Sequence, residues 1–171
     1  MEQLLREFPV GREGASTDWR AAENELGVHV STPCRQLVER YAHGCFDDFI
    51  WVFHPQSSNE NLNLVHKTEE VRWVLGELVS PAATQILEEH QISVNDLVAW
   101  GATGNGDFCF SVDPDEAPGS LTLVCDPRGP EWEAFELEPG DFLGRVLAGD
   151  ITCSIFPDDF PSEDPGIYFE Q

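Results

Sequence analysis

Two short apolar runs separated by an Asn-Gly turn constrain the fold of this chain more than any other feature. Residues 97–101 and 108–112 have the composition of β-strands, and Asn105-Gly106 lies between them. Asn-Gly is the strongest short-range signal for a β-hairpin, because both central residues of a type I′ turn need a positive φ. We therefore predict an antiparallel hairpin with a type I′ turn in the second half of the chain.

The strand-like pattern continues after this hairpin. Residues 121–125 and 132–137 predict two more strands, joined by the turn residues 126–130. An earlier strand is predicted at residues 49–53, where a continuous apolar run indicates burial on both faces of a sheet. Together these segments predict a largely antiparallel sheet of about 4–6 strands.

Six other segments have the apolar spacing and the end signals of helices. Thr32 as a cap and Pro33 in the first turn begin one of them, and Ser80-Pro81 repeats the combination. The predicted helices cover residues 2–8, 17–26, 32–43, 62–79, 80–90 and 139–149. Runs of helices followed by runs of strands indicate an α+β fold, here a single domain over residues 1–149 with helices packed around the sheet. Residues 150–171 form an acidic tail rich in proline and aromatic residues, which we expect to pack on that domain.

The sequence is strongly acidic, with 32 Asp and Glu against nine Lys and Arg and a formal net charge of −23. A foldable domain with this excess repels itself, and a basic partner would offset the cost. Nucleic acid and an anionic membrane surface are disfavoured as ligands, because both are bound through clustered Lys and Arg. Residues 91–171 contain 17 acidic and two basic residues, so this half is expected to face a cationic partner.

Other features of the composition indicate a cytoplasmic protein. The five cysteines are odd in number and form no C-x-x-C pair, which indicates reduced, mostly buried thiols. No window approaches the roughly 20 apolar residues of a membrane span. The first residues also lack the cationic and then apolar pattern of a secretory signal. Whether the protein is a monomer or a weak dimer stays open.

Motifs for catalysis or cofactor binding are weak. The glycines of residues 101–106 resemble a dinucleotide loop, but the segment that follows predicts a strand and not the required helix. Four Cys and His residues between positions 34 and 54 have spacings that match no zinc pattern, and no G-x-S-x-G motif is present. We expect Trp51, Trp73 and Trp100 to belong to the core. We therefore expect no cofactor, no metal, no catalytic residue and no enzymatic activity.

Several blocks of residues resemble one known family. They are Trp19 with Glu25-Leu26-Gly27, the runs Tyr41 to Ile50, Trp100 to Asp107 and Trp132 to Phe135, and Asp141-Phe142-Leu143. Together they are similar to the SUKH superfamily, the domain shared by a fungal cell-wall-synthesis regulator and many bacterial immunity proteins. The chain departs from the family pattern at Ala42, where glycine is usual, and at Phe110, where tryptophan is common. The matching blocks mark turns and core positions, so the resemblance implies no particular binding surface.

The resemblance implies a cytoplasmic antitoxin that binds and blocks a cognate toxin domain of a polymorphic or contact-dependent toxin system. Such toxins are often nucleases, which are typically basic because they hold nucleic acid. An acidic inhibitor would associate quickly with a basic toxin through electrostatic steering. Two alternatives stay open, namely a regulatory or scaffolding domain that binds a host protein and an acidic DNA mimic. A hydrolase without a recognisable motif is the least favoured hypothesis.

The candidate contact residues are acidic side chains on predicted loops and strands. The first set, from the more acidic half, comprises Asp113, Asp115, Glu116, Asp126, Glu131 and Glu133. Asp47 and Asp48, which precede the first predicted strand, form the second set. Because one exposed charge contributes little by itself, a plain solvated surface role is the alternative for each of these carboxylates.

Overall fold

The α+β fold predicted from the sequence is confirmed by the computed structural model, which describes residues 1–9, 17–77, 80–112, 120–129 and 131–170. These residues form six α-helices and one antiparallel sheet of seven strands, one strand more than the upper end of the predicted range. Short 3₁₀ segments at Glu60–Leu62 and Val94–Asp96 precede α4 (Leu64–Glu77) and β3 (Val98–Thr103).

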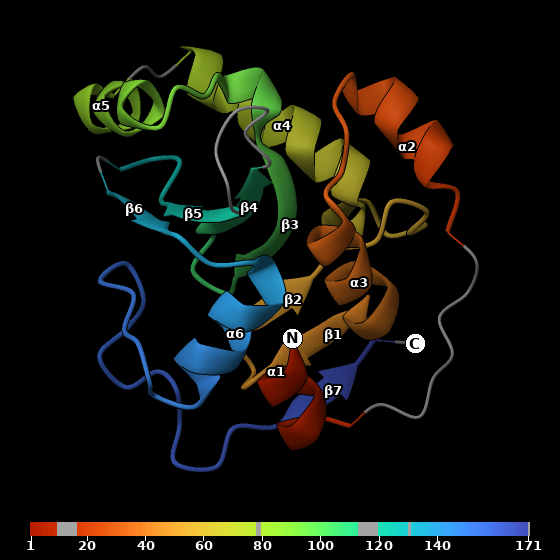
Figure 1. Cartoon of the computed structure of the whole chain (residues 1–171), viewed down its shortest axis with the longest axis vertical. Coiled ribbons are helices and arrows are strands. Elements are labelled where there is room, and N and C mark those ends of the chain that lie inside the picture. Colours follow the sequence, from red (N-terminus) through yellow and green to blue (C-terminus); the bar gives the residue numbers. More distant parts are fainter. Residues whose placement is uncertain (10–16, 78–79, 113–119, 130, 171) are drawn as a thin grey trace.

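The sheet is a meander to which the C-terminal strand returns. Its order is β6-β5-β4-β3-β2-β1-β7, so six consecutive strands lie side by side and β7 pairs with β1 at one edge (Figure 1). The strands are β1 (Gly44–Phe46), β2 (Ile50–Val52), β3 (Val98–Thr103), β4 (Phe108–Val112), β5 (Leu121–Cys125), β6 (Trp132–Phe135) and β7 (Ile167–Phe169). The sequence pattern did not predict β1 and β7, because strands of three residues carry too little alternation to be recognised.

The helices begin at side-chain caps in three cases. Asp18, Ser31 and Ser80 each accept a hydrogen bond from a backbone N–H in the first helical turn. The prediction for Ser80 is confirmed, whereas the predicted cap Thr32 is already the first helical residue. The helices are α1 (Glu2–Glu7), α2 (Trp19–Leu26), α3 (Thr32–Tyr41), α4 (Leu64–Glu77), α5 (Pro81–Glu89) and α6 (Pro139–Leu147).

Helices cover both faces of the sheet (Figure 1). On one face, α6 packs against β5 and is flanked by α1 and α3. On the other face α4 packs against β3, and α2 lies beside α4. The short helix α5 contacts β6, at the edge of the sheet opposite β7. In the described part of the chain, no helix covers the area of the α4 face where β2, β3 and β4 contribute Trp51, Ala102 and Phe108 to a groove.

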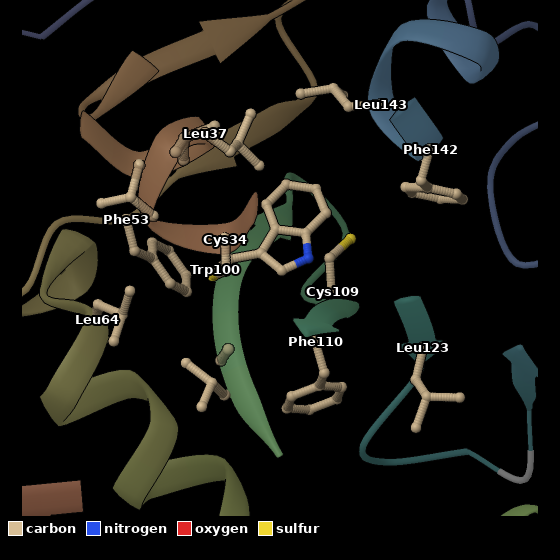
Figure 2. Packing of buried hydrophobic residues seen from close by; sticks show 14 of the residues in the cluster. Cys34, Leu37, Phe53, Leu64, Trp100, Cys109, Phe110, Leu123, Phe142 and Leu143 are labelled. Atoms are coloured by element: carbon tan, nitrogen blue, oxygen red, sulfur yellow. The ribbon is translucent and has the colours of Figure 1, made fainter. Parts of the chain in front are cut away.

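Trp100 occupies the centre of the core. The β3–β4 register shifts between Ala99 and Gly101, and this bulge turns the intervening Trp100 toward α3 and α6. Its side chain is fully buried, and Figure 2 shows the indole ring between side chains of those two helices, among them Leu37 and Phe142. The expectation that Trp100 is a core residue is therefore confirmed.

The expectation of burial in the core is wrong for Trp73 and only partly correct for Trp51. Trp73 is 69% exposed, because α4 turns Val71 and Leu75 toward the interior and residue 73 lies on the opposite side of the helix. Trp51 is half-buried, so the predicted burial of its strand on both faces is also incomplete. Both tryptophans are therefore available at the surface of the α4 face.

The predicted β3–β4 hairpin is confirmed, but its turn is not type I′. Only Gly106 has a positive φ, of 93°, whereas Gly104 and Asn105 do not. The N–H of Gly106 donates to the carbonyl of Thr103 (3.0 Å), and the N–H of Thr103 donates to the carbonyl of Asp107 (2.9 Å). These bonds define a longer turn that ends in a glycine bulge, the common form when a third loop residue takes the positive φ.

A type I′ turn occurs instead between β1 and β2. Asp47 and Asp48 have φ values of 53° and 54°, and the N–H of Phe49 donates to the carbonyl of Phe46 over 2.9 Å. Aspartate tolerates this left-handed conformation better than most residues, because its short polar side chain can bond locally. The two aspartates thus form the tip of a hairpin and do not simply precede a strand.

Gly101 provides the first test of this packing. A Cβ at this position would overlap the backbone carbonyl oxygen of Trp51, which cannot move without disturbing β2. We expect Gly101→Ala to lower the free energy of unfolding by about 3 kcal/mol, measured by urea denaturation. Gly76→Ala is the matched control, because a Cβ there meets open space on α4. The control should stabilise the protein by about 0.5–1 kcal/mol, and a similar loss in both variants would contradict the close approach of β3 to β2.

Asp107 provides a test by pH. Burial raises the pKa of its carboxyl above the ordinary 3.8, although the Thr103 hydroxyl donates a hydrogen bond to it (2.7 Å). The folded state therefore favours the protonated form of Asp107. The stability that this protonated carboxyl contributes is lost as the pH rises through the raised pKa. We expect Asp107→Asn to gain stability relative to the wild type between about pH 3 and pH 7, as measured by urea denaturation at each pH. If the difference in stability between Asp107→Asn and the wild type stayed constant with pH, the raised pKa of Asp107 would be contradicted.

Candidate partner-binding surface

The predicted contact residues of the more acidic half do not form one cluster. Asp113, Asp115 and Glu116 lie outside the described residues. Asp126 is engaged within its own turn, where it accepts a hydrogen bond from the N–H of Arg128 (2.9 Å) and lies 3.7 Å from the Arg128 guanidinium. Glu131 is exposed close to this turn, at the β6 edge of the sheet.

Two of the predicted contact residues fasten the C-terminal tail. Glu133 accepts hydrogen bonds from the N–H (2.7 Å) and the hydroxyl (2.8 Å) of Ser154. Asp47 holds Ser162 in the same way, through its N–H (2.7 Å) and its hydroxyl (2.5 Å). These carboxylates therefore have a structural use, whereas Asp48 is exposed.

A concavity forms where the β1–β2 turn meets the tail. It has a volume of about 620 Å³, and its lining includes the carboxylates of Asp47, Asp48, Asp159 and Asp164. Phe49, Phe160 and Tyr168 contribute aromatic surface to it. Among the described residues no Lys or Arg lines this acidic concavity, and no ion pair involves its four carboxylates. It is therefore a site of concentrated negative charge.

The tail residues of this concavity were missed in the sequence. Asp159 and Asp164 belong to a stretch, residues 150–171, that contains six acidic residues and no basic one. That local imbalance is the signal that could have identified them. The tail is held against the domain by the pairing of β7 with β1 and by aromatic contacts, including Phe49 with Phe160 at 4.7 Å between ring centroids.

An apolar groove of about 540 Å³ lies on the α4 face of the sheet. Trp51, Ala102 and Phe108 form its floor, and they are direct partners across β2, β3 and β4. Val71 and Val74 of α4 form one wall. Most of the exposed area inside this groove is contributed by such apolar side chains.

Tyr168 joins the apolar groove to the acidic concavity. It lines the concavity, and its ring lies edge-on to Trp51 with 5.3 Å between the centroids. Contact with the Cys45 thiol, together with the nearby Asp48 and Glu170 carboxylates, raises the pKa of Tyr168 to about 12. The phenol therefore stays neutral at physiological pH in a region of negative potential.

The cationic side chains of the apolar groove are compensated within the chain. Lys67 forms an ion pair with Glu70 (2.7 Å), and Arg128 donates to the carbonyl of Asn105 (2.8 Å) while lying close to Asp126. Glu170, also in the lining, accepts only from the Asn59 amide (3.3 Å) in the described part of the chain. The groove therefore has no uncompensated positive charge to offer an anionic ligand.

The thiols are poorly suited to nucleophilic chemistry. All five cysteines are free and buried. Burial raises the pKa of Cys45 to about 11 and that of Cys34 and Cys153 to about 12, and it raises the pKa of Cys109 and Cys125 as well. Because the thiolate is the reactive form, these side chains are inert at neutral pH.

Two further observations concern the residues that the structure describes. They contain no group of three or more His, Cys, Asp or Glu side chains placed to hold a metal ion. Their helices are all too short or too polar to cross a membrane.

A composite surface of this kind is typical of protein–protein interfaces. Aromatic residues are enriched at the centre of such interfaces, and charged residues form their rim.

Comparisons of the chain with known protein families, with curated proteins and with solved structures found no match. The surface itself and the resemblance of the sequence blocks are therefore the features that bear on function.

Proposed function

We propose that this chain is an immunity protein that binds and neutralises a cognate, basic toxin domain of the nuclease type. The observation that carries the proposal is the acidic concavity, placed beside surface aromatics in a chain of net charge −23. The resemblance of the Trp100 to Asp107 block to SUKH proteins supports the same role. The toxin would belong to a bacterial polymorphic or contact-dependent toxin system.

The proposed mechanism is stoichiometric binding without catalysis. The negative potential of the concavity steers the basic face of the toxin toward the inhibitor, because complementary fields raise the association rate. Once bound, the acidic surface competes for the cleft in which the toxin holds its polyanionic substrate. The protein acts in the cytoplasm and needs no metal or cofactor for this role.

Titration of toxin activity tests the proposal. The toxin domain that we expect the neighbouring upstream gene to encode is assayed on nucleic acid while the purified protein is added. We expect activity to fall linearly and to vanish at about one equivalent, as tight stoichiometric inhibition requires. Turnover that continues at a large excess of the protein would contradict the proposal. Similar affinity for several unrelated basic proteins would favour the DNA-mimic alternative.

A further inference from the structure

Trp73 and Tyr168 are the two exposed large hydrophobic side chains among the described residues, and each is next to a residue that lines the apolar groove, Trp73 along the chain and Tyr168 by ring contact. Tyr168 is 44% exposed and contacts Trp51 on the groove floor. Trp73 directly precedes Val74 in the groove wall and lies one helical turn from Glu70, which also lines the groove. Exposed aromatic side chains close to an apolar groove are typical of an interaction site.

Carboxylates that form no ion pair within the described structure lie near both aromatics, although Glu69 also interacts at longer range with the Arg72 guanidinium. On α4, Glu69 and Glu77 are exposed four residues before and after Trp73. Asp48 and Glu170 lie close enough to Tyr168 to raise its pKa. In the described parts of the chain, no ion pair involves any of these four carboxylates. The groove is thus apolar along its floor and acidic beside its two exposed rings.

We propose that the apolar groove receives a segment of a protein partner in which aliphatic or aromatic side chains alternate with Lys or Arg. The apolar side chains contact Trp51, Phe108 and Val74. The cationic side chains lie against Trp73 and Tyr168, where the ring faces and the adjacent carboxylates both attract them. This inference rests on the proposed function and specifies the chemistry of the toxin segment that docks beside the acidic concavity.

Two synthetic peptides test the groove without the toxin. Both have about 14 residues and the same positive charge, but one combines Lys with Leu and the other combines Lys with Ser. By calorimetric titration, we expect the wild type to bind the Lys/Leu peptide at least about tenfold more tightly than the Lys/Ser peptide. The double variant Trp73→Ala with Val74→Ser should lose this preference, because it removes the exposed indole beside the groove and an apolar side chain of the groove wall without changing any charge.

Gln85→Ala, on α5 at the other edge of the sheet, is the control and should keep the preference. Equal affinity of the wild type for both peptides would overturn the inference, as would a preference that survives in the double variant. Failure of the proposed function gives a different result, namely no inhibition of the toxin by the wild type. Peptide discrimination without inhibition would therefore keep the groove and reject the immunity role.

Discussion

Asp159→Lys with Asp164→Lys is expected to slow association with the toxin domain by about 10- to 100-fold at low salt. Both side chains are exposed in the acidic concavity and hold no cation in the described structure. Charges at the rim of an interface act mainly on the encounter rate, so the dissociation rate should change little. Stopped-flow tryptophan fluorescence measures both rates.

A second charge reversal separates position from net charge. Glu88→Lys with Glu89→Lys changes the net charge equally, but these exposed residues lie on α5, which contacts the β6 edge and not the β7 edge (Figure 1). We expect this pair to slow association by no more than about threefold at the same salt concentration, because it lies far from the concavity. The difference between the two pairs should shrink at about 1 M salt, where charges are screened beyond about 3 Å. Equal slowing by both pairs would show that only the total charge matters.

The largest loss of stability is expected for Trp100→Ala. The side chain is fully buried between α3 and α6, and the ring of Phe142 lies 6.5 Å from its own ring. Removing it leaves a cavity, and we expect the free energy of unfolding to fall by about 3–5 kcal/mol. Urea denaturation followed by circular dichroism measures the change.

The same substitution at Trp73 is the matched control. Trp73 is 69% exposed, so Trp73→Ala should change stability by no more than about 0.5 kcal/mol. Trp100→Phe separates the loss of volume from the loss of a polar group, because the indole N–H of Trp100 has no hydrogen-bond partner among the residues that the structure describes. This variant should lose less than Trp100→Ala, since it keeps most of the ring and removes a buried unpaired donor. Equal losses in the two alanine variants would contradict the placement of the core.

Local signals in the sequence were sufficient for most of the fold. The proline and serine at the start of α5, the closing helix and the β3–β4 hairpin follow from short-range rules. Trp73 was misplaced because its type favours burial, and only the orientation of α4 against the sheet decides which side faces out. The β1–β2 turn was missed because it uses two aspartates in place of the usual Asn-Gly.

The candidate surface was harder to predict, because it is assembled from distant parts of the chain. Tyr168 reaches Trp51 only through the pairing of β7 with β1, between segments that are more than 100 residues apart. The concavity likewise combines the turn at Asp47-Asp48 with the tail residues Asp159 and Asp164. The composition of the sequence shows the excess of acidic residues. Where those carboxylates come together depends on how the tail packs on the domain.

Growth of cells that produce the toxin domain is the most direct test of the proposed immunity function. The toxin domain is expressed alone, with the wild-type protein, and with the Asp159→Lys, Asp164→Lys variant at equal protein levels. We expect the wild type to restore growth and the charge-reversed variant to restore it less well than the Glu88→Lys, Glu89→Lys control. Cells that stay arrested with the wild-type protein, although it is folded and abundant, would contradict the proposed immunity function.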